Sequence, residues 1–172
     1  MGYTHYWQQH RDFTRPEWVA LMSAALAIID HAKAKGIRLT GFSNEDPAAG
    51  PHVDFDEIGL NGFGKDAHET LCLARERDKS LGWFCKTARK PYDPVVCSIL
   101  LAAWLIAPDA ITLKSDGDYE PPGYAWPEWT AAVAFYDEAV SRVTTQQHAW
   151  LLRDMGEGNL PKFREAKKQH AR

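Results

Sequence analysis

The sequence has few cysteines, no basic excess and no long apolar run. Its three cysteines (Cys72, Cys85 and Cys97) form no C-x-x-C pair, which argues against a disulfide framework and is typical of a reducing compartment. The formal net charge of −3 argues against a dedicated DNA-binding protein, because such proteins carry a strong positive charge. No segment approaches the about 20 apolar residues of a membrane span, and residues 1–10 are too polar for a secretory signal. We therefore expect a cytoplasmic protein without membrane association.

The composition is that of one globular domain. Hydrophobic residues make up 45% and charged residues 25% of the 172 residues, which is enough apolar material for a core without cross-links. We expect residues 1–160 to form this domain and the basic, polar residues 161–172 to be a frayed tail.

Helix-capping residues at both ends of an amphipathic segment predict the first helix. Thr14 followed by Glu17 is a capping-box pattern, and apolar residues recur every three or four positions from Trp18 to Ala32. Gly36 is expected to end this helix.

Two further helices follow in the second half of the chain. Asp93 and Pro94 are expected to be the N-cap and the first residue of a helix over 95–107, which is apolar nearly all round and therefore buried. A third helix is expected to begin near Pro127.

Short segments with alternating or β-branched residues predict strands between these helices. The expected strands cover 1–8, 37–42, 53–58, 58–61, 69–74, 81–85 and 111–114. Asn61-Gly62 is expected to be a tight hairpin turn. The order of elements indicates an α+β fold, a mostly antiparallel sheet with about three helices packed on one face.

A cationic segment before the second helix is the strongest candidate for a binding site. Three cations and a hydroxyl fall within five residues, at a helix start whose free N–H groups favour anions. The candidate phosphate-binding residues are Lys86, Thr87, Arg89 and Lys90. Two alternatives remain: a solvated basic turn, or capping of the same N–H groups by Asp93.

Aromatic and histidine side chains supply the remaining candidates. Stacking and polar contacts with a ligand are predicted for His5, Tyr6, Trp7 and Tyr92, and backbone approach near Asn61 is predicted from its neighbouring glycines. His5 and His68 are the candidate acid/base catalysts. The alternatives are a structural histidine at position 5 and a hairpin turn followed by surface charges around 61–69.

Metal and thiol chemistry find little support in the sequence. His68 and Cys72 would share a face only in a helix, and no second pair of ligands accompanies them, so we expect neither a metal site nor a cofactor. Cys85 lies beside Lys86, yet a small apolar thiol at that position is expected to pack in the core.

Four segments together resemble a family of small, uncharacterised proteins of tailed phages and prophages. They are residues 2–7 (GYTHYW), 61–62 (NG), 68–69 (HE) and 84–93 (FCKTARKPYD), so the resemblance covers roughly residues 1–106. The resemblance implies a phage context, with the host cytosol as the compartment, and no assigned activity. Small phage proteins often counter host defence, and one class sequesters nucleotide immune signals.

These observations lead to one preferred function and two alternatives. The preferred function is binding and sequestration of a small phosphate-bearing ligand, such as a nucleotide-derived immune signal, by a host-defence inhibitor. The alternatives are an enzyme that cleaves a nucleotide or phosphoester, and an inhibitor that binds a host protein through exposed aromatic residues. A homo-oligomer is expected only by analogy with other sequestering proteins.

Overall fold

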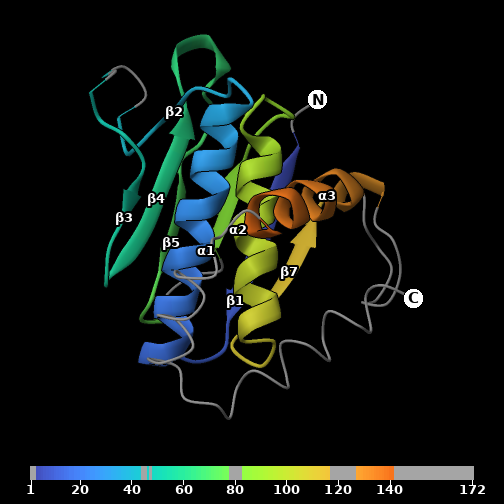
Figure 1. Cartoon of the computed structure of the whole chain (residues 1–172). Helices are drawn as coiled ribbons and strands as arrows, with labels where there is room; N and C mark the ends of the chain where they lie inside the picture. The colour runs from blue at the N-terminus through green and yellow to red at the C-terminus, as the bar shows by residue number, and fades with distance from the viewer. Residues whose placement is uncertain (1–2, 44–45, 47, 78–82, 117–126, 142–172) are drawn as a thin grey trace.

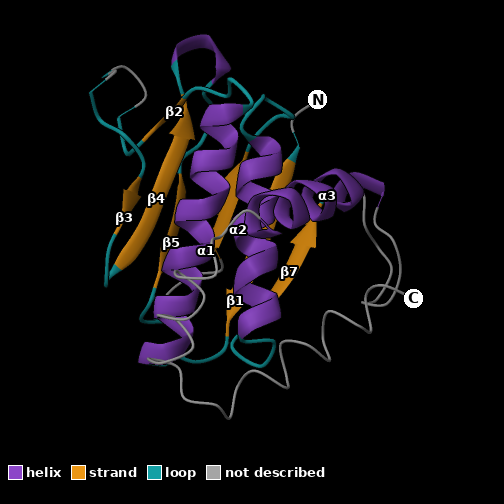
Figure 2. Ribbon diagram, viewed as in Figure 1, coloured by secondary structure: helices purple, strands orange, loops and turns teal. Residues whose placement is uncertain are grey.

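In the part of the chain that the structure describes, three α-helices lie on one side of a layer of antiparallel strands (Figure 1). The computed structural model describes residues 3–43, 46, 48–77, 83–116 and 127–141. The expected α+β class is confirmed, and every strand pair in the described part of the chain is antiparallel (Figure 2). The expected tail at 161–172, together with the domain boundary at 160, lies outside the described residues.

The strands form two sheets. In the first, β1 (Thr4–Gln9) lies between β6 (Trp83–Lys86) and β7 (Ile111–Ser115). In the second, the order is β2 (Leu39–Thr40), β4 (Glu57–Gly62) and β3 (His52–Val53), and β5 (Leu71–Ala74) also pairs with β4. The Glu69 N–H donates to the Lys86 carbonyl across 3.2 Å, so the two sheets adjoin where β5 approaches β6.

The first helix, α1 (Arg15–Ala34), begins and ends as predicted. The Glu17 N–H donates to the Thr14 hydroxyl, and the Thr14 N–H donates to the Glu17 carboxylate at 2.8 Å, which completes the capping box. The helix ends at Ala34 with Lys35 as its C-cap, and Gly36 then adopts a φ of +78°, a conformation that glycine reaches without strain.

The start of α2 (Asp93–Ile106) corrects the sequence-based prediction. Tyr92 occupies the N-cap position without a side-chain cap, and Asp93 is the first residue of the helix. The Asp93 carboxylate faces His5 and Thr87 instead of the helix N–H groups. Asp93 therefore connects α2 to β1 and to the preceding loop.

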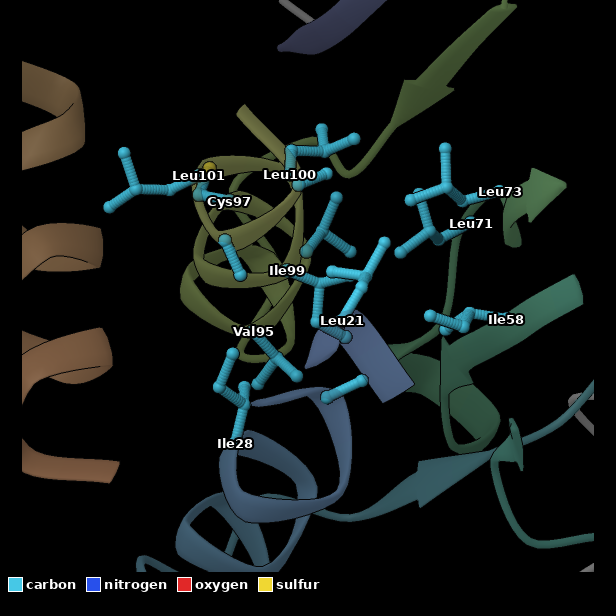
Figure 3. Packing of buried hydrophobic residues seen from close by; sticks show 14 of the residues in the cluster. Leu21, Ile28, Ile58, Leu71, Leu73, Val95, Cys97, Ile99, Leu100 and Leu101 are labelled. Carbon is cyan, nitrogen blue, oxygen red and sulfur yellow. The ribbon is translucent and has the colours of Figure 1, made fainter. Parts of the chain in front are cut away.

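The core lies between the helices and the inner face of the strands. α2 packs against both α1 and α3 (Pro127–Ser141), and α3 runs across α2 in Figure 1. Figure 3 shows Leu21 of α1 and Ile99 of α2 near Ile58 and Leu71 of the second sheet. The expectation that the second helix is the most buried is confirmed, because each residue from Val95 to Ala103 is buried.

The Asn61-Gly62 hairpin turn was wrongly predicted. Both residues belong to β4, and the chain returns to β5 only after the short 3₁₀ helix η1 (Gly64–Asp66). The Asn61 side chain stabilises this longer connection: its Oδ1 accepts the N–H of His68 and its Nδ2 donates to the Thr70 hydroxyl. Asn61 therefore stabilises a loop through its side-chain hydrogen bonds and does not itself form the turn.

Several expected strands are shorter in the structure. The segment 37–42 contributes only the two residues of β2, and the segment 69–74 begins its strand at Leu71. In the latter case Glu69 bonds to Lys86 of the neighbouring sheet and so leaves the ladder with β4.

The capping box leads to a prediction about pH. Burial alone would raise the pKa of Glu17, but hydrogen bonds from Arg11 and Thr14 outweigh it and lower that pKa below 4.5. Glu17→Gln should therefore reduce the free energy of unfolding by about 1 kcal/mol at neutral pH. The stabilising effect is fully present above pH 4.5 and lost as the pH falls through the lower, folded-state pKa.

Urea unfolding of both proteins between pH 3 and pH 7 tests this (roughly the range over which carboxylates titrate). The difference in the free energy of unfolding between wild type and variant should disappear near pH 3, where Glu17 is protonated (roughly one pH unit below the carboxylate reference pKa). A gap that stays constant with pH would show that the charge of Glu17 contributes nothing.

Candidate functional site

The outer face of the first sheet carries two rows of side chains, which we call the aromatic row and the polar row. The aromatic row is Phe84, Tyr6 and Lys114, because Tyr6 is directly opposite Phe84 on β6 and Lys114 on β7. The Tyr6 and Phe84 rings have centroids 6.4 Å apart and are 39% and 54% exposed. An exposed aromatic pair on neighbouring strands is a surface on which a planar ligand can stack.

The polar row lies next to the aromatic row, two residues away along each strand. Lys86 is directly opposite Thr4, and Asp116 follows β7 at the same level. The Asp116 carboxylate accepts the Thr4 N–H at 3.0 Å and the Tyr6 hydroxyl at 2.9 Å. The hydrogen bond to Asp116 raises the pKa of Tyr6, so the phenol stays a neutral donor and its ring is held in place.

A glutamate fixes the backbone of Lys86. The Glu69 carboxylate accepts the Lys86 N–H at 2.7 Å, and the Glu69 carbonyl accepts the Tyr92 hydroxyl, also at 2.7 Å. Lys86 therefore projects from a strand whose free edge is occupied by Glu69. Its side chain is partly exposed on the same outer face as Phe84, two residues earlier in β6.

The other three residues of the predicted cationic site point elsewhere. Thr87 is fully buried, and its hydroxyl bonds to the Asp93 carboxylate. The Arg89 guanidinium lies 4.3 Å from the centroid of the Tyr3 ring, and the Lys90 ammonium donates to the carbonyl of Lys65 at 2.9 Å. Because Ala88 and Arg89 have φ of 50° and 55°, the loop turns sharply, and Lys86 is separated from the cations that follow it.

Three predicted aromatic or histidine residues lie inside the protein. His5 is buried, with Nδ1 2.7 Å from the Ser115 hydroxyl and Nε2 2.9 Å from Asp93. Trp7 is 3% exposed on the same inner face. Burial raises the pKa of Tyr92, whose side chain is enclosed under the loop. A ligand at the surface therefore cannot stack on these three rings in this conformation.

The remaining candidates from the sequence are also separated. Asn61 is 2% exposed and engaged in the loop contacts described above. His68 is exposed in that loop, whereas His5 is enclosed between β1 and α2. Cys85 packs in the core as expected, and burial raises the pKa of its thiol, so it is a poor nucleophile.

Of the predicted binding residues, Tyr6 and Lys86 share the outer face, and sequence reasoning missed their partners there. Phe84, Lys114 and Asp116 were not selected. The alternation of β6 places Phe84 and Lys86 on one face and could have linked them. No local signal could have identified Lys114 and Asp116, because they join Tyr6 through strand pairing more than 100 residues away in sequence.

The described residues also include a concave region away from the outer face. One hollow of about 300 Å³ is lined by Lys33, Gly36, Ile37, Arg38, Leu39 and Phe63. The Arg38 guanidinium lies 3.8 Å from the centroid of the Phe63 ring, so this aromatic face is already covered. A planar ligand finds uncovered rings at Tyr6 and Phe84 instead.

Comparisons of the chain with protein-family models, with curated proteins and with solved structures find no match. Among the helices of the described residues, none combines the length and apolar character needed to cross a membrane.

Proposed function

We propose that the outer face of β6, β1 and β7 binds a small phosphate-bearing ligand with a planar base, most simply a nucleotide. The observation that carries this proposal is the exposed Tyr6–Phe84 pair with a lysine in each of the two rows. The rings supply stacking to the base, and Lys86 and Lys114 supply charge to the phosphates. This function follows the sequence-based expectation, with Phe84 and Lys114 in place of the enclosed residues.

The resemblance to phage proteins supports a narrower form of the proposal. A protein that sequesters a nucleotide signal of host defence needs to bind its ligand without converting it. The outer face fits this requirement because its polar row is a lysine, a threonine and a carboxylate whose oxygens already accept two hydrogen bonds. We therefore propose sequestration by binding, without turnover.

Equilibrium dialysis tests the proposal with three probes: ATP, a cyclic dinucleotide and inorganic phosphate. We expect one of the two nucleotides to bind, and Phe84→Ala to weaken its binding roughly 5- to 150-fold, since one base–aromatic stack contributes about 1–3 kcal/mol. Lys86→Ala should weaken binding most at low salt, because a phosphate contact is screened by ions. Phe55→Ala is the matched control, since Phe55 is 55% exposed and lies outside this sheet.

The outcomes separate the proposal from its competitors. Equal affinity in Phe84→Ala, Lys86→Ala and Phe55→Ala would overturn the binding site. Nucleotide recovered intact after heat denaturation supports sequestration, whereas a converted product would replace it with an enzyme. Failure of both nucleotides to bind would overturn the proposal and favour a protein partner for the exposed rings.

A further inference from the structure

Three metal-ligating side chains meet on the inner side of β1, opposite the outer face. They are His5 of β1 and, four residues apart on one face of α2, Asp93 and Cys97. Their donor atoms all lie within 4.8 Å of one another. The His5 Nε2 atom is 2.9 Å from Asp93 Oδ1 and 3.3 Å from Cys97 Sγ.

The sulfur of Cys97 lies beside the His5 ring, and the Asp93 carboxylate lies at the Nε2 atom. Cys97 Sγ is 3.3 Å from Nε2 and 3.7 Å from Nδ1, so it is off the line of the Nε2 lone pair. Asp93 Oδ1 is 2.9 Å from Nε2. A cation at Nε2 would therefore meet the imidazole and carboxylate donors directly, and the Cys97 thiol would reach it by turning its side chain.

Neighbouring residues hold two of the three side chains, His5 and Asp93, in place. The second ring nitrogen of His5, Nδ1, lies 2.7 Å from the Ser115 hydroxyl, which accepts the Trp129 indole N–H at 3.1 Å. The Thr87 hydroxyl donates to the Asp93 carboxylate. Histidine ligands of metals commonly make such a bond through the nitrogen that does not bind the metal, and carboxylate ligands are held by similar bonds.

We propose that His5, Asp93 and Cys97 form a binding site for a zinc ion or a similar borderline transition metal. Imidazole and thiolate together favour zinc over calcium or magnesium, which prefer oxygen ligands. A tetrahedral zinc site separates its nitrogen and sulfur ligands by about 3.5 Å, close to the 3.3 Å between Nε2 and Sγ. Because Sγ is also 3.7 Å from Nδ1, the Cys97 side chain must turn toward the Nε2 lone pair when the metal binds. The oxygen and nitrogen need to part by only about 0.5 Å to reach the same geometry.

The site leaves one coordination position for a non-protein ligand. The His5 side chain is 1% exposed and that of Asp93 is 19% exposed, so solvent approaches from the carboxylate side. Three protein ligands with water in the fourth position is the arrangement of metal sites that remain open to a further ligand. Burial raises the pKa of the Cys97 thiol in the metal-free protein, and a coordinated cation reverses that effect by favouring the thiolate.

Cobalt substitution tests the site directly. Protein treated with a chelator is titrated with Co²⁺, and we expect one equivalent to bind with a thiolate-to-cobalt charge-transfer band in the near ultraviolet. Added Zn²⁺ should displace it. Cys97→Ser should abolish the charge-transfer band, whereas Cys85→Ser should retain it. Cys85 is the matched control because it is buried, directly opposite His5 on β6, and bonded to the Glu69 carbonyl.

Ser115→Ala separates a metal site from a purely structural cluster. Loss of the bond to Nδ1 should lower the Co²⁺ affinity about 10- to 100-fold while the charge-transfer band remains, since Cys97 is untouched. Circular dichroism of each variant with chelator present establishes that it is folded, and His5→Gln replaces Cys97→Ser if the latter fails this test. Absence of Co²⁺ binding, or a band that survives in Cys97→Ser, would overturn the proposal without affecting nucleotide binding on the opposite face.

Discussion

Asp93→Ala is expected to lower the free energy of unfolding of the metal-free protein by about 3 kcal/mol. The Asp93 carboxylate accepts hydrogen bonds from His5 and Thr87, and both of those side chains are buried. Removing the acceptor leaves two buried polar groups without this partner. Each buried, unsatisfied group costs about 1–3 kcal/mol.

Urea unfolding in the presence of a chelator measures this effect. Asp30→Ala is the control, because the Asp30 side chain is 79% exposed and its ion pair with Lys33 is a surface contact at 3.6 Å. That variant should change stability by less than about 0.5 kcal/mol. Equal stability of the two variants would mean that Asp93 is not the link between β1, the loop and α2.

Asp93→Asn separates the contribution of the negative charge from that of the hydrogen-bond acceptor. The asparagine keeps one oxygen that can accept a hydrogen bond from either His5 or Thr87, so part of the stability should return. If Asp93→Asn is as unstable as Asp93→Ala, the negative charge matters more than the acceptor.

The elements that the sequence predicted well are those whose stabilising contacts are local. The start of α1 depends on Thr14 and Glu17, three residues apart, and the pattern identifies both. Asp93 shows the opposite case. Its sequence context is that of an N-cap, but its side chain bonds to His5, 88 residues away. Tertiary pairing overrides the local preference because burying the His5 imidazole requires a partner.

The candidate site could be predicted only in part for the same reason. Tyr6 and Lys86 can be selected from the sequence because an aromatic ring can stack on a base and a lysine can bind phosphate. The alternation of side chains along a strand then shows which neighbours share their face. The register between β1 and β6 decides that Tyr6 meets Phe84, and a shift of one residue would have put Cys85 there. The buried cluster of His5, Asp93 and Cys97 was missed because β1 and α2 meet only through the folded core.

Gly62→Ala is expected to destabilise the protein by about 3 kcal/mol. A Cβ atom at position 62 would lie 2.2 Å from the carbonyl oxygen of Asp66 and 3.0 Å from Cδ1 of Tyr92. The first neighbour is backbone of η1 and cannot rotate away, so the strand or the 3₁₀ helix must move. Tyr92 is fully buried and its hydroxyl donates to Glu69, which also fixes Lys86. The strain should therefore extend from β4 to the loop that carries Lys86.

Gly50→Ala is the matched control, because a Cβ at position 50 would meet no atom within 4 Å. It should leave the free energy of unfolding within about 0.5 kcal/mol of the wild type. Urea unfolding measures both effects, and near-ultraviolet circular dichroism of the aromatic side chains shows whether the surroundings of Tyr92 change with Gly62→Ala alone. Equal stability of the two alanine variants would mean that β4 and η1 separate at little cost. In that case Lys86 would depend on Glu69 alone for its position on the outer face.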